Sequence, residues 1–223
     1  MPLSILYEDN HLLVLNKPAG LATMGVTEDR ESLVQLAKDD LKRRFNKPGN
    51  VYLGVVSRLD STVSGVIVLA RTSKAASRLN DQFKSRDVEK VYWAIVSGKP
   101  PQSGECVDRL WHDDRAQCVK VVDAQHAGAQ EARLSFRRLQ PITRGTWLEV
   151  QLHTGRKHQI RVQLAERGWP VWGDKKYGSR ESFAAGIALH ARRLAIDHPT
   201  RDERMEFIAP VPASWKSFGV TNG

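Results

Sequence analysis

Short β-type runs recur along the chain and limit the folds that it can adopt. Apolar, β-branched and aromatic residues gather in short segments, and turn-forming residues separate them. In one segment Ala132, Leu134 and Phe136 alternate with polar residues, which is the pattern of a strand with one exposed face. The expected strands are residues 5–7, 12–15, 66–70, 91–97, 119–122, 132–139, 147–152 and 187–196.

Helical spacing of apolar residues occurs in only a few places. It is found over residues 33–45 and again over 75–83, where Thr72 or Ser73 can serve as the N-cap. Strands that follow one another in sequence, with few helices between them, favour antiparallel pairing. The sequence therefore predicts an α+β fold, a mixed and mostly antiparallel sheet with flanking helices, and not a doubly wound fold.

The composition is that of an ordinary globular protein. Of the 223 residues, 41% are hydrophobic and 26% are charged, which is enough for a buried core. The Pro- and Gly-rich stretch at residues 98–104 is too short to establish a linker, so we expect one domain of two lobes over residues 1–223. Cys106 and Cys118 lack the number and spacing of a zinc site, and the histidines lack the spacing of metal ligands, so no metal is expected.

The charge balance is strongly basic. Lysine and arginine number 34 against 25 aspartate and glutamate, which gives a net charge of +9. Such a surface attracts polyanions, with nucleic acid as the first candidate and a membrane surface as the second. No apolar stretch reaches the roughly 18 residues of a membrane span, and the first ten residues do not have the pattern of a signal peptide. We therefore expect a cytoplasmic protein that does not enter the membrane.

Asp60 lies in a turn between two apolar segments, residues 51–56 and 66–70, and Arg58 is its nearest charged neighbour in sequence. Either Asp60 caps the turn by accepting a hydrogen bond from the backbone near Thr62, or the fold holds a reactive carboxylate at the floor of a cleft. Taken alone, the turn cap is the better supported of the two interpretations.

Residues 154–161 form a second polar cluster, after an alternating strand. Thr154 can cap a helix, and Arg156, Lys157 and Arg161 then fall in its opening turns. The helix dipole disfavours cations there by up to about 1 kcal/mol, so a negative partner is expected. RNA or DNA phosphates would suit the outward pair, and a carboxylate such as Asp60 would suit Arg161. A solvated basic turn is the alternative.

Five segments between residues 17 and 199, taken in order, carry a resemblance to a known family. They are Lys17-Pro18-Ala19-Gly20-Leu21; Arg58-Leu59-Asp60 with Ser64-Gly65; Lys90, Tyr92, Ala94, Val96 and Gly98; Thr154 to Arg161 with Gly168, Pro170, Gly173-Asp174 and Lys176-Tyr177-Gly178; and Leu189-His190-Ala191 with His198-Pro199. Together they resemble the motifs of the RluA-type pseudouridine synthases, which isomerise uridine within RNA.

The resemblance implies the fold, a central active-site cleft and the chemistry. Such an enzyme breaks the N1–C1′ bond of uridine, turns the uracil and joins C5 to C1′, so no cofactor is required. By similarity, Asp60 is the catalytic carboxylate near the sugar. Tyr92 stacks against the target base and assists proton transfer, with a core aromatic beside Trp93 as the alternative. Arg161 is the ion-pair partner that keeps Asp60 charged and oriented.

The same resemblance gives the expected RNA contacts. Arg58 fills the gap that the flipped nucleotide leaves in the RNA stack, unless it is an ordinary surface arginine. Lys17, Arg156, Lys157 and His158 are expected to contact RNA as well. The partner is ribosomal or transfer RNA, and the protein is expected to act as a monomer.

Two positions depart from the family pattern. Ser57 stands where the family usually has His, and Val63 stands where it usually has Thr, and both changes remove hydrogen-bonding capacity beside Asp60. Residues 1–16 are also too few for an accessory RNA-binding domain, so none is expected. These departures keep open a catalytically silent RNA-binding protein or RNA-folding aid on the same fold. A nuclease or phosphotransferase is disfavoured, since its carboxylate cluster or phosphate loop is missing.

Overall fold

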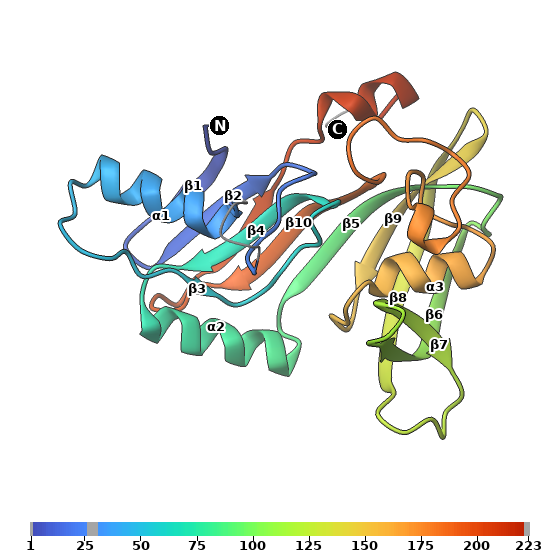
Figure 1. The fold of residues 1–223 in the computed structure, drawn as a ribbon, viewed down its shortest axis with the longest axis horizontal. Coiled ribbons are helices and arrows are strands. Elements are labelled where there is room, and N and C mark those ends of the chain that lie inside the picture. Colours follow the sequence, from blue (N-terminus) through green and yellow to red (C-terminus); the bar gives the residue numbers. More distant parts are fainter. Residues whose placement is uncertain (1, 26–30, 221–223) are drawn as a thin grey trace. The chain divides into compact units, whose positions relative to one another are not determined.

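The computed structural model of the protein describes residues 2–25 and 31–220. The chain divides into two compact units, one made of Met1–Glu89 and Ala191–Pro212 and the other of Lys90–His190 and Ala213–Gly223 (Figure 1). Both units combine β-strands with one or two α-helices, so the predicted α+β fold is confirmed.

The first unit is built on a sheet with the strand order β1-β2-β4-β10, to which β3 adds on β4 and β11 adds on β10. The β1–β2, β2–β4, β3–β4 and β10–β11 pairs are antiparallel. Its elements are β1 (Ile5–Glu8), β2 (Leu12–Lys17), α1 (Leu33–Arg44), β3 (Gly54–Val55), β4 (Ser64–Ala70), α2 (Ser73–Ser85), all but the first two residues of β10 (Leu189–Asp197), and β11 (Arg204–Ile208).

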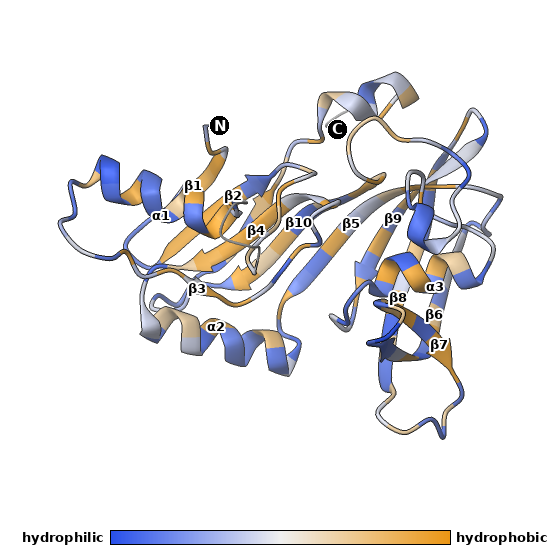
Figure 2. Ribbon diagram, viewed as in Figure 1, coloured by the Kyte–Doolittle hydropathy of each residue, from blue (hydrophilic) through white to orange (hydrophobic). Residues whose placement is uncertain are grey.

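Helix α1 covers β2 and β4 because the apolar residues of all three elements form one cluster. Figure 2 shows β2 and β4 as hydrophobic strands, while α1 and α2 each have a hydrophilic side. Phe45, expected to extend the apolar stripe of α1, is instead 48% exposed, because the helix ends at Arg44 and the ring lies beside the guanidinium groups of Arg44 and Arg71. The buried cluster is Leu13, Leu15, Leu33, Val34, Ala37, Leu41, Val51, Leu53, Ile67 and Leu69.

The N-caps of the two helices are short hydroxyl side chains. Ser32 accepts a hydrogen bond from the backbone N–H of Gln35 at the start of α1. Thr72 accepts one from the backbone N–H of Ala75 at the start of α2, so the cap that we expected there is confirmed.

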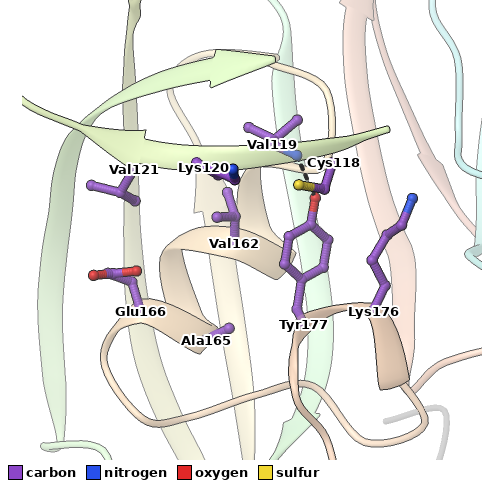
Figure 3. Close-up of a pocket in the computed structure, with 9 residues that line it drawn as sticks. All are labelled: Cys118, Val119, Lys120, Val121, Val162, Ala165, Glu166, Lys176 and Tyr177. Atoms are coloured by element: carbon purple, nitrogen blue, oxygen red, sulfur yellow. Dashed lines mark hydrogen bonds between the residues drawn. The ribbon is translucent and has the colours of Figure 1, made fainter. Parts of the chain in front are cut away.

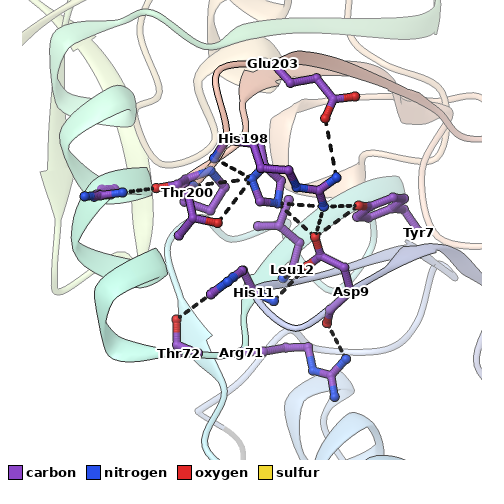
Figure 4. A network of polar contacts seen from close by, with 12 residues as sticks. Tyr7, Asp9, His11, Leu12, Arg71, Thr72, His198, Thr200 and Glu203 are labelled. Atoms are coloured by element: carbon purple, nitrogen blue, oxygen red, sulfur yellow. Dashed lines mark hydrogen bonds and ion pairs between the residues drawn. The ribbon is translucent and has the colours of Figure 1, made fainter.

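A polar network anchors the turn between β1 and β2 (Figure 4). Asp9 Oδ1 accepts hydrogen bonds of 2.7 Å from the backbone N–H groups of His11 and Leu12. Its other oxygen receives donors from His198 and Arg201, both in the segment around the β10–β11 turn. Burial acts to raise the pKa of Asp9, but the backbone and side-chain hydrogen bonds outweigh it and hold that pKa well below its usual value.

His198 has a structural place in this network. Its Nδ1 accepts hydrogen bonds from the backbone N–H groups of Thr200 and Arg201, so the ring proton lies on Nε2, which donates to Asp9. His198 is 3% exposed, so its hydrogen bonds hold the turn together from inside the protein.

The second unit contains an antiparallel sheet with the order β5-β9-β8-β6-β7. Strand β6 escaped prediction because its apolar residues are sparse: Cys106 and Leu110 are buried, whereas Glu105, Val107 and Arg109 are exposed. The elements are β5 (Glu89–Val96, with Glu89 in the first unit), β6 (Ser103–Asp113), β7 (Cys118–Val122), β8 (Gln130–Ile142), β9 (Gly145–Leu152), α3 (Gln159–Glu166), and the 3₁₀ helices η1 (Lys175–Tyr177) and η2 (Ala213–Phe218).

Among the described residues, no helix has the length and apolar character needed to cross a membrane.

Candidate active site

The Asp60 loop, residues 58–62, connects β3 with the buried strand β4. Leu59 packs against the apolar cluster of the first unit, while Arg58 is exposed and Asp60 is half-buried. The backbone N–H of Val63 donates to the carbonyl of Asp60 at 3.0 Å and closes the turn. This backbone hydrogen bond fixes the turn that carries Asp60.

Lys17, at the end of β2, fastens this loop to the segment that follows β2. Its ammonium donates to the carbonyls of Pro18, Leu21 and Ser61 at 2.9, 2.7 and 3.3 Å. The backbone N–H of Gly20 also donates to the Ser61 carbonyl, at 2.7 Å. Lys17 is 0% exposed, so its burial gives it a structural role in place of the direct RNA contact that the sequence predicted.

The charge on Lys17 is not cancelled by these carbonyls. Burial lowers the pKa of Lys17 to about 8, and the negative charge of Asp60 acts in the opposite direction. Lys17 and Asp60 therefore interact electrostatically within the first unit.

A second clamp holds the other side of the loop. The Thr23 hydroxyl donates to the Leu59 carbonyl at 2.8 Å and accepts from the Leu59 N–H at 3.2 Å. The loop is thus fixed by Lys17, Thr23 and its own backbone. Val63 is buried at the start of β4, so the hydroxyl that it lacks is not needed for these contacts.

Gly65, in the motif around Asp60, occupies a position that requires a glycine. Its φ of +120° is a conformation that residues with side chains rarely adopt. A Cβ at this position would lie 2.2 Å from the carbonyl oxygen of Ala191 in β10. Only glycine lets β4 approach β10 this closely, immediately after the Asp60 loop.

Tyr92 lies in β5, where it is half-buried and pairs in register with Val150 of β9. Its neighbour Trp93 points to the other face of the sheet, because side chains alternate along a strand. Trp93 meets Trp147 edge to face, with ring centroids 4.8 Å apart. A core packing aromatic was the alternative interpretation of Tyr92, and Trp93 fits that description better.

The segment before α3 corrects one prediction. Thr154 does not cap the helix, which begins five residues later at Gln159. Instead its hydroxyl accepts from the backbone N–H of Arg133 at 2.8 Å and lies 2.7 Å from the Gln159 side-chain oxygen. The Gln159 amide in turn donates to the Arg133 carbonyl, so both buried side chains bond to β8. Arg156 and Lys157 consequently precede the helix, and the argument from its dipole does not apply to them.

Arg161, in the first turn of α3, forms a buried ion pair that we did not predict. Its Nε and Nη2 donate to the two carboxylate oxygens of Asp174 at 2.6 and 2.9 Å. The side chains are 7% and 1% exposed. A side-on pair of this kind fixes the plane of the guanidinium. The sequence did hint at Asp174, because this residue belongs to one of the five motifs, but the sequence did not show which residue it pairs with.

The three remaining basic candidates surround the start of α3. Arg156 Nε donates to the Glu131 carbonyl at 3.0 Å. Lys157 is exposed, with its ammonium 2.7 Å from His112 Nε2. His158 adopts a left-handed conformation, with φ 55°, and its Nδ1 lies 2.7 Å from the Tyr177 hydroxyl.

Each unit thus holds part of the predicted site. The first unit brings Lys17 and Arg58 to the Asp60 loop, and the second carries Tyr92 together with the residues around Arg161. The described residues contain no group of three or more His, Cys, Asp or Glu side chains arranged to hold a metal ion.

Comparison with known proteins identifies the class of this arrangement. The family model described as RNA pseudouridylate synthase matches residues 11–166. An uncharacterised RNA pseudouridine synthase of Synechocystis is 36% identical over 99% of this chain and 69% of its own length. Ribosomal large subunit pseudouridine synthase D of Xanthomonas campestris is 35% identical over 95% of this chain and 67% of its own length.

Solved structures of proteins with the same class of name are also similar to this chain. Human RNA pseudouridylate synthase domain containing 4 is similar with a TM-score of 0.79 and 25% identity, covering 97% of this chain and 93% of that one. Human RNA pseudouridylate synthase domain containing 1 has a TM-score of 0.76 and 26% identity, over 95% and 84% of the two chains. The chain belongs to the RNA pseudouridylate synthase family, and it is an isomerase of the pseudouridine synthase class.

Proposed function

We propose that the protein converts specific uridines of ribosomal or transfer RNA to pseudouridine, with Asp60 as the catalytic carboxylate. The observation that carries this proposal is the double clamp on the Asp60 loop. Lys17 donates to the Ser61 carbonyl and Thr23 bonds to the Leu59 backbone, so both chain neighbours of the half-buried Asp60 are held. A group that is held in place before the substrate arrives can react without a further ordering cost.

The reaction needs a carboxylate near C1′. Cleavage of the N1–C1′ bond develops positive charge on the sugar, and a carboxylate there stabilises that charge or traps the carbon covalently. After the uracil has turned and C5 has joined C1′, the proton on C5 must be removed by a base. We assign the first role to Asp60. Tyr92 stacks against the target base and assists the later proton transfer.

Arg161 is assigned as the partner that orients Asp60 and keeps it ionised. Asp174 engages the edge of the guanidinium formed by Nε and Nη2. The opposite edge, formed by Nη1 and Nη2, carries the N–H groups that a second carboxylate would accept from. Charge-assisted hydrogen bonds from this edge would orient the Asp60 carboxylate and favour its ionised form.

The remaining candidates are assigned to RNA. Exposed Arg58 occupies the space that the flipped uridine leaves, which offsets part of the few kcal/mol that flipping costs. Arg156, Lys157 and His158 contact the phosphate backbone around the target. Ribosomal RNA is the first substrate to test, because the name of the Xanthomonas relative assigns that protein to the large ribosomal subunit.

The test is release of tritium from RNA labelled at uridine C5. Wild-type protein should release label from unmodified ribosomal RNA without added metal, and Asp60→Ala should release none above background. Asp81→Ala, which removes an exposed carboxylate from α2, is the matched control and should act like the wild type. If wild type and Asp60→Ala bind RNA equally and neither releases label, the protein is a silent RNA-binding member of the family and the proposal fails.

A further inference from the structure

Tyr177 occupies a junction between β7, α3 and η1. It lines a pocket of about 440 Å³ with residues of the same three elements, and Figure 3 shows its ring rising from η1 toward β7. The ring also packs against the apolar cluster of Leu110, Val119, Ala132 and Val162. The motif that contains Tyr177 has so far received no function.

The hydroxyl of Tyr177 joins β7 to the start of α3. It accepts a hydrogen bond of 3.0 Å from the backbone N–H of Val119 and lies 2.7 Å from His158 Nδ1. Burial raises the pKa of Tyr177, so the phenol keeps its proton. The phenol can then donate to Nδ1 of a neutral His158 while it accepts from Val119, which uses its one proton and one of its lone pairs.

The ring of Tyr177 lies under the guanidinium of Arg161. The Arg161 Cζ is 5.0 Å from the ring centroid, within the range of a cation–π contact. Asp174, three residues before Tyr177, holds the edge of the same guanidinium. Asp174, the N-cap of η1, and Tyr177 within η1 therefore both contact Arg161, one through a carboxylate and the other through an aromatic ring.

We propose that Tyr177 is a positioning residue for Arg161: its ring restrains the guanidinium, and its hydroxyl ties that ring to β7 and to the start of α3. The catalytic consequence rests on the role of Arg161 in the proposed function, while the positioning itself does not. Asp174 restrains the guanidinium through two directed hydrogen bonds, and the Tyr177 ring adds a cation–π contact to the same group.

The first experiment reads Arg161 directly, without RNA. In ¹⁵N-labelled protein, the Nε–H signal of Arg161 reports how firmly the guanidinium is held, through its exchange with water. Tyr177→Met keeps most of the side-chain volume but removes the ring, and it should speed this exchange about tenfold. Tyr177→Phe keeps the ring and should leave the Arg161 exchange within about threefold of wild type, while the Val119 amide exchanges about tenfold faster.

Lys176→Met is the matched control. Lys176 is the neighbour of Tyr177 in η1 and also bonds to the β6–β7 connection, through the Gln117 carbonyl, but no contact with Arg161 is known for it. It should leave the Arg161 exchange unchanged. If Tyr177→Met does not fold, the wild-type spectrum still decides, because a ring beneath Arg161 must shift its side-chain protons upfield. Unshifted protons, or equal exchange in wild type and Tyr177→Met, would overturn the proposal.

The second experiment measures coupling in the reaction. Tyr177→Met should lower kcat for tritium release about tenfold and leave KM for RNA within about twofold. In combination with Arg161→Lys it should add no further loss, because both changes disable the same group. Multiplicative losses would assign Tyr177 a role independent of Arg161. If the wild type itself releases no tritium, the proposed function fails and the exchange measurement alone decides the role of Tyr177.

Discussion

Lys17 and Arg161 are both buried cations, one in each unit, but the positive charge of each is accommodated in a different way. Lys17 is surrounded by carbonyl oxygens of the backbone. Arg161 is matched by a carboxylate and lies over an aromatic ring. Carbonyls satisfy the hydrogen bonds of an ammonium but do not cancel its charge, whereas a carboxylate does both.

The two cations can therefore serve different purposes. Lys17 donates its hydrogen bonds to backbone carbonyls and interacts with Asp60 through its charge, while burial lowers its pKa to about 8. The charge of Arg161 is balanced by Asp174, and Arg161 contributes directed N–H groups. Lys17 supports the Asp60 loop electrostatically, and Arg161 offers an edge of N–H groups that can bind a carboxylate.

The largest expected effect comes from removing the carboxylate beside Arg161. Asp174→Ala leaves a guanidinium buried without its counter-charge, which should lower the free energy of unfolding by about 3–5 kcal/mol. Asp108→Ala is the matched control, since Asp108 pairs with Arg167 in the same unit but both side chains are more exposed. Urea unfolding measures both. If Asp174→Ala lowers the free energy of unfolding no more than Asp108→Ala does, the buried Arg161–Asp174 pair does not contribute more to stability than the more exposed pair.

The pH dependence of stability distinguishes Lys17 from Arg161. The pKa of Lys17 is lower in the folded protein than in the unfolded chain, so between about pH 8 and 10.5 the unfolded chain binds the extra proton. Stability from this group must therefore rise with pH across that window, by up to about 3 kcal/mol. Lys17→Arg cannot titrate there and should lack the rise.

The measurement is urea unfolding of wild type and Lys17→Arg from pH 7 to 10.5. The difference between the two free energies of unfolding should change through this range in favour of the wild type. Parallel curves would mean that Lys17 is not held in a desolvated place.

The smallest expected effect concerns the basic residues before α3. Arg156→Ala and Lys157→Ala should each weaken RNA binding a few-fold and reduce the salt slope of log K by about 1, as expected for one lost phosphate contact. Lys84→Ala, an exposed lysine in α2, serves as the control for a general loss of charge. Slopes identical to the control would place Arg156 and Lys157 away from the RNA.

The sequence predicted the elements whose side chains repeat a clear pattern. The buried runs of β2 and β4 and the apolar stripe of α1 are of this kind. Strand β6 was missed because few of its residues are apolar, and β11, with Phe207 as its only buried residue, was missed for the same reason. The Asp60 loop could be found because an acid between two apolar segments is unusual.

The partners of the site residues were harder to predict because they depend on folding. Nothing local shows that Lys17 turns inward to three carbonyls, since a lysine is ordinarily exposed. Thr154 has the form of a helix cap, but Gln159 offers its hydroxyl a side-chain partner and holds both on β8. Asp174 and Tyr177 meet Arg161 only through the tertiary packing of η1 on α3.

The most direct test of Asp60 as the catalytic carboxylate is a map of pseudouridines in the RNA of the cells that carry this gene. A strain without the gene should lose pseudouridine at one or more defined uridines. The wild-type gene should restore those sites, and a gene encoding Asp60→Asn, which keeps the shape of the side chain but not its charge, should restore none. Restoration by Asp60→Asn, or a map unchanged by deletion, would contradict the assignment of Asp60 as the carboxylate that acts on uridine.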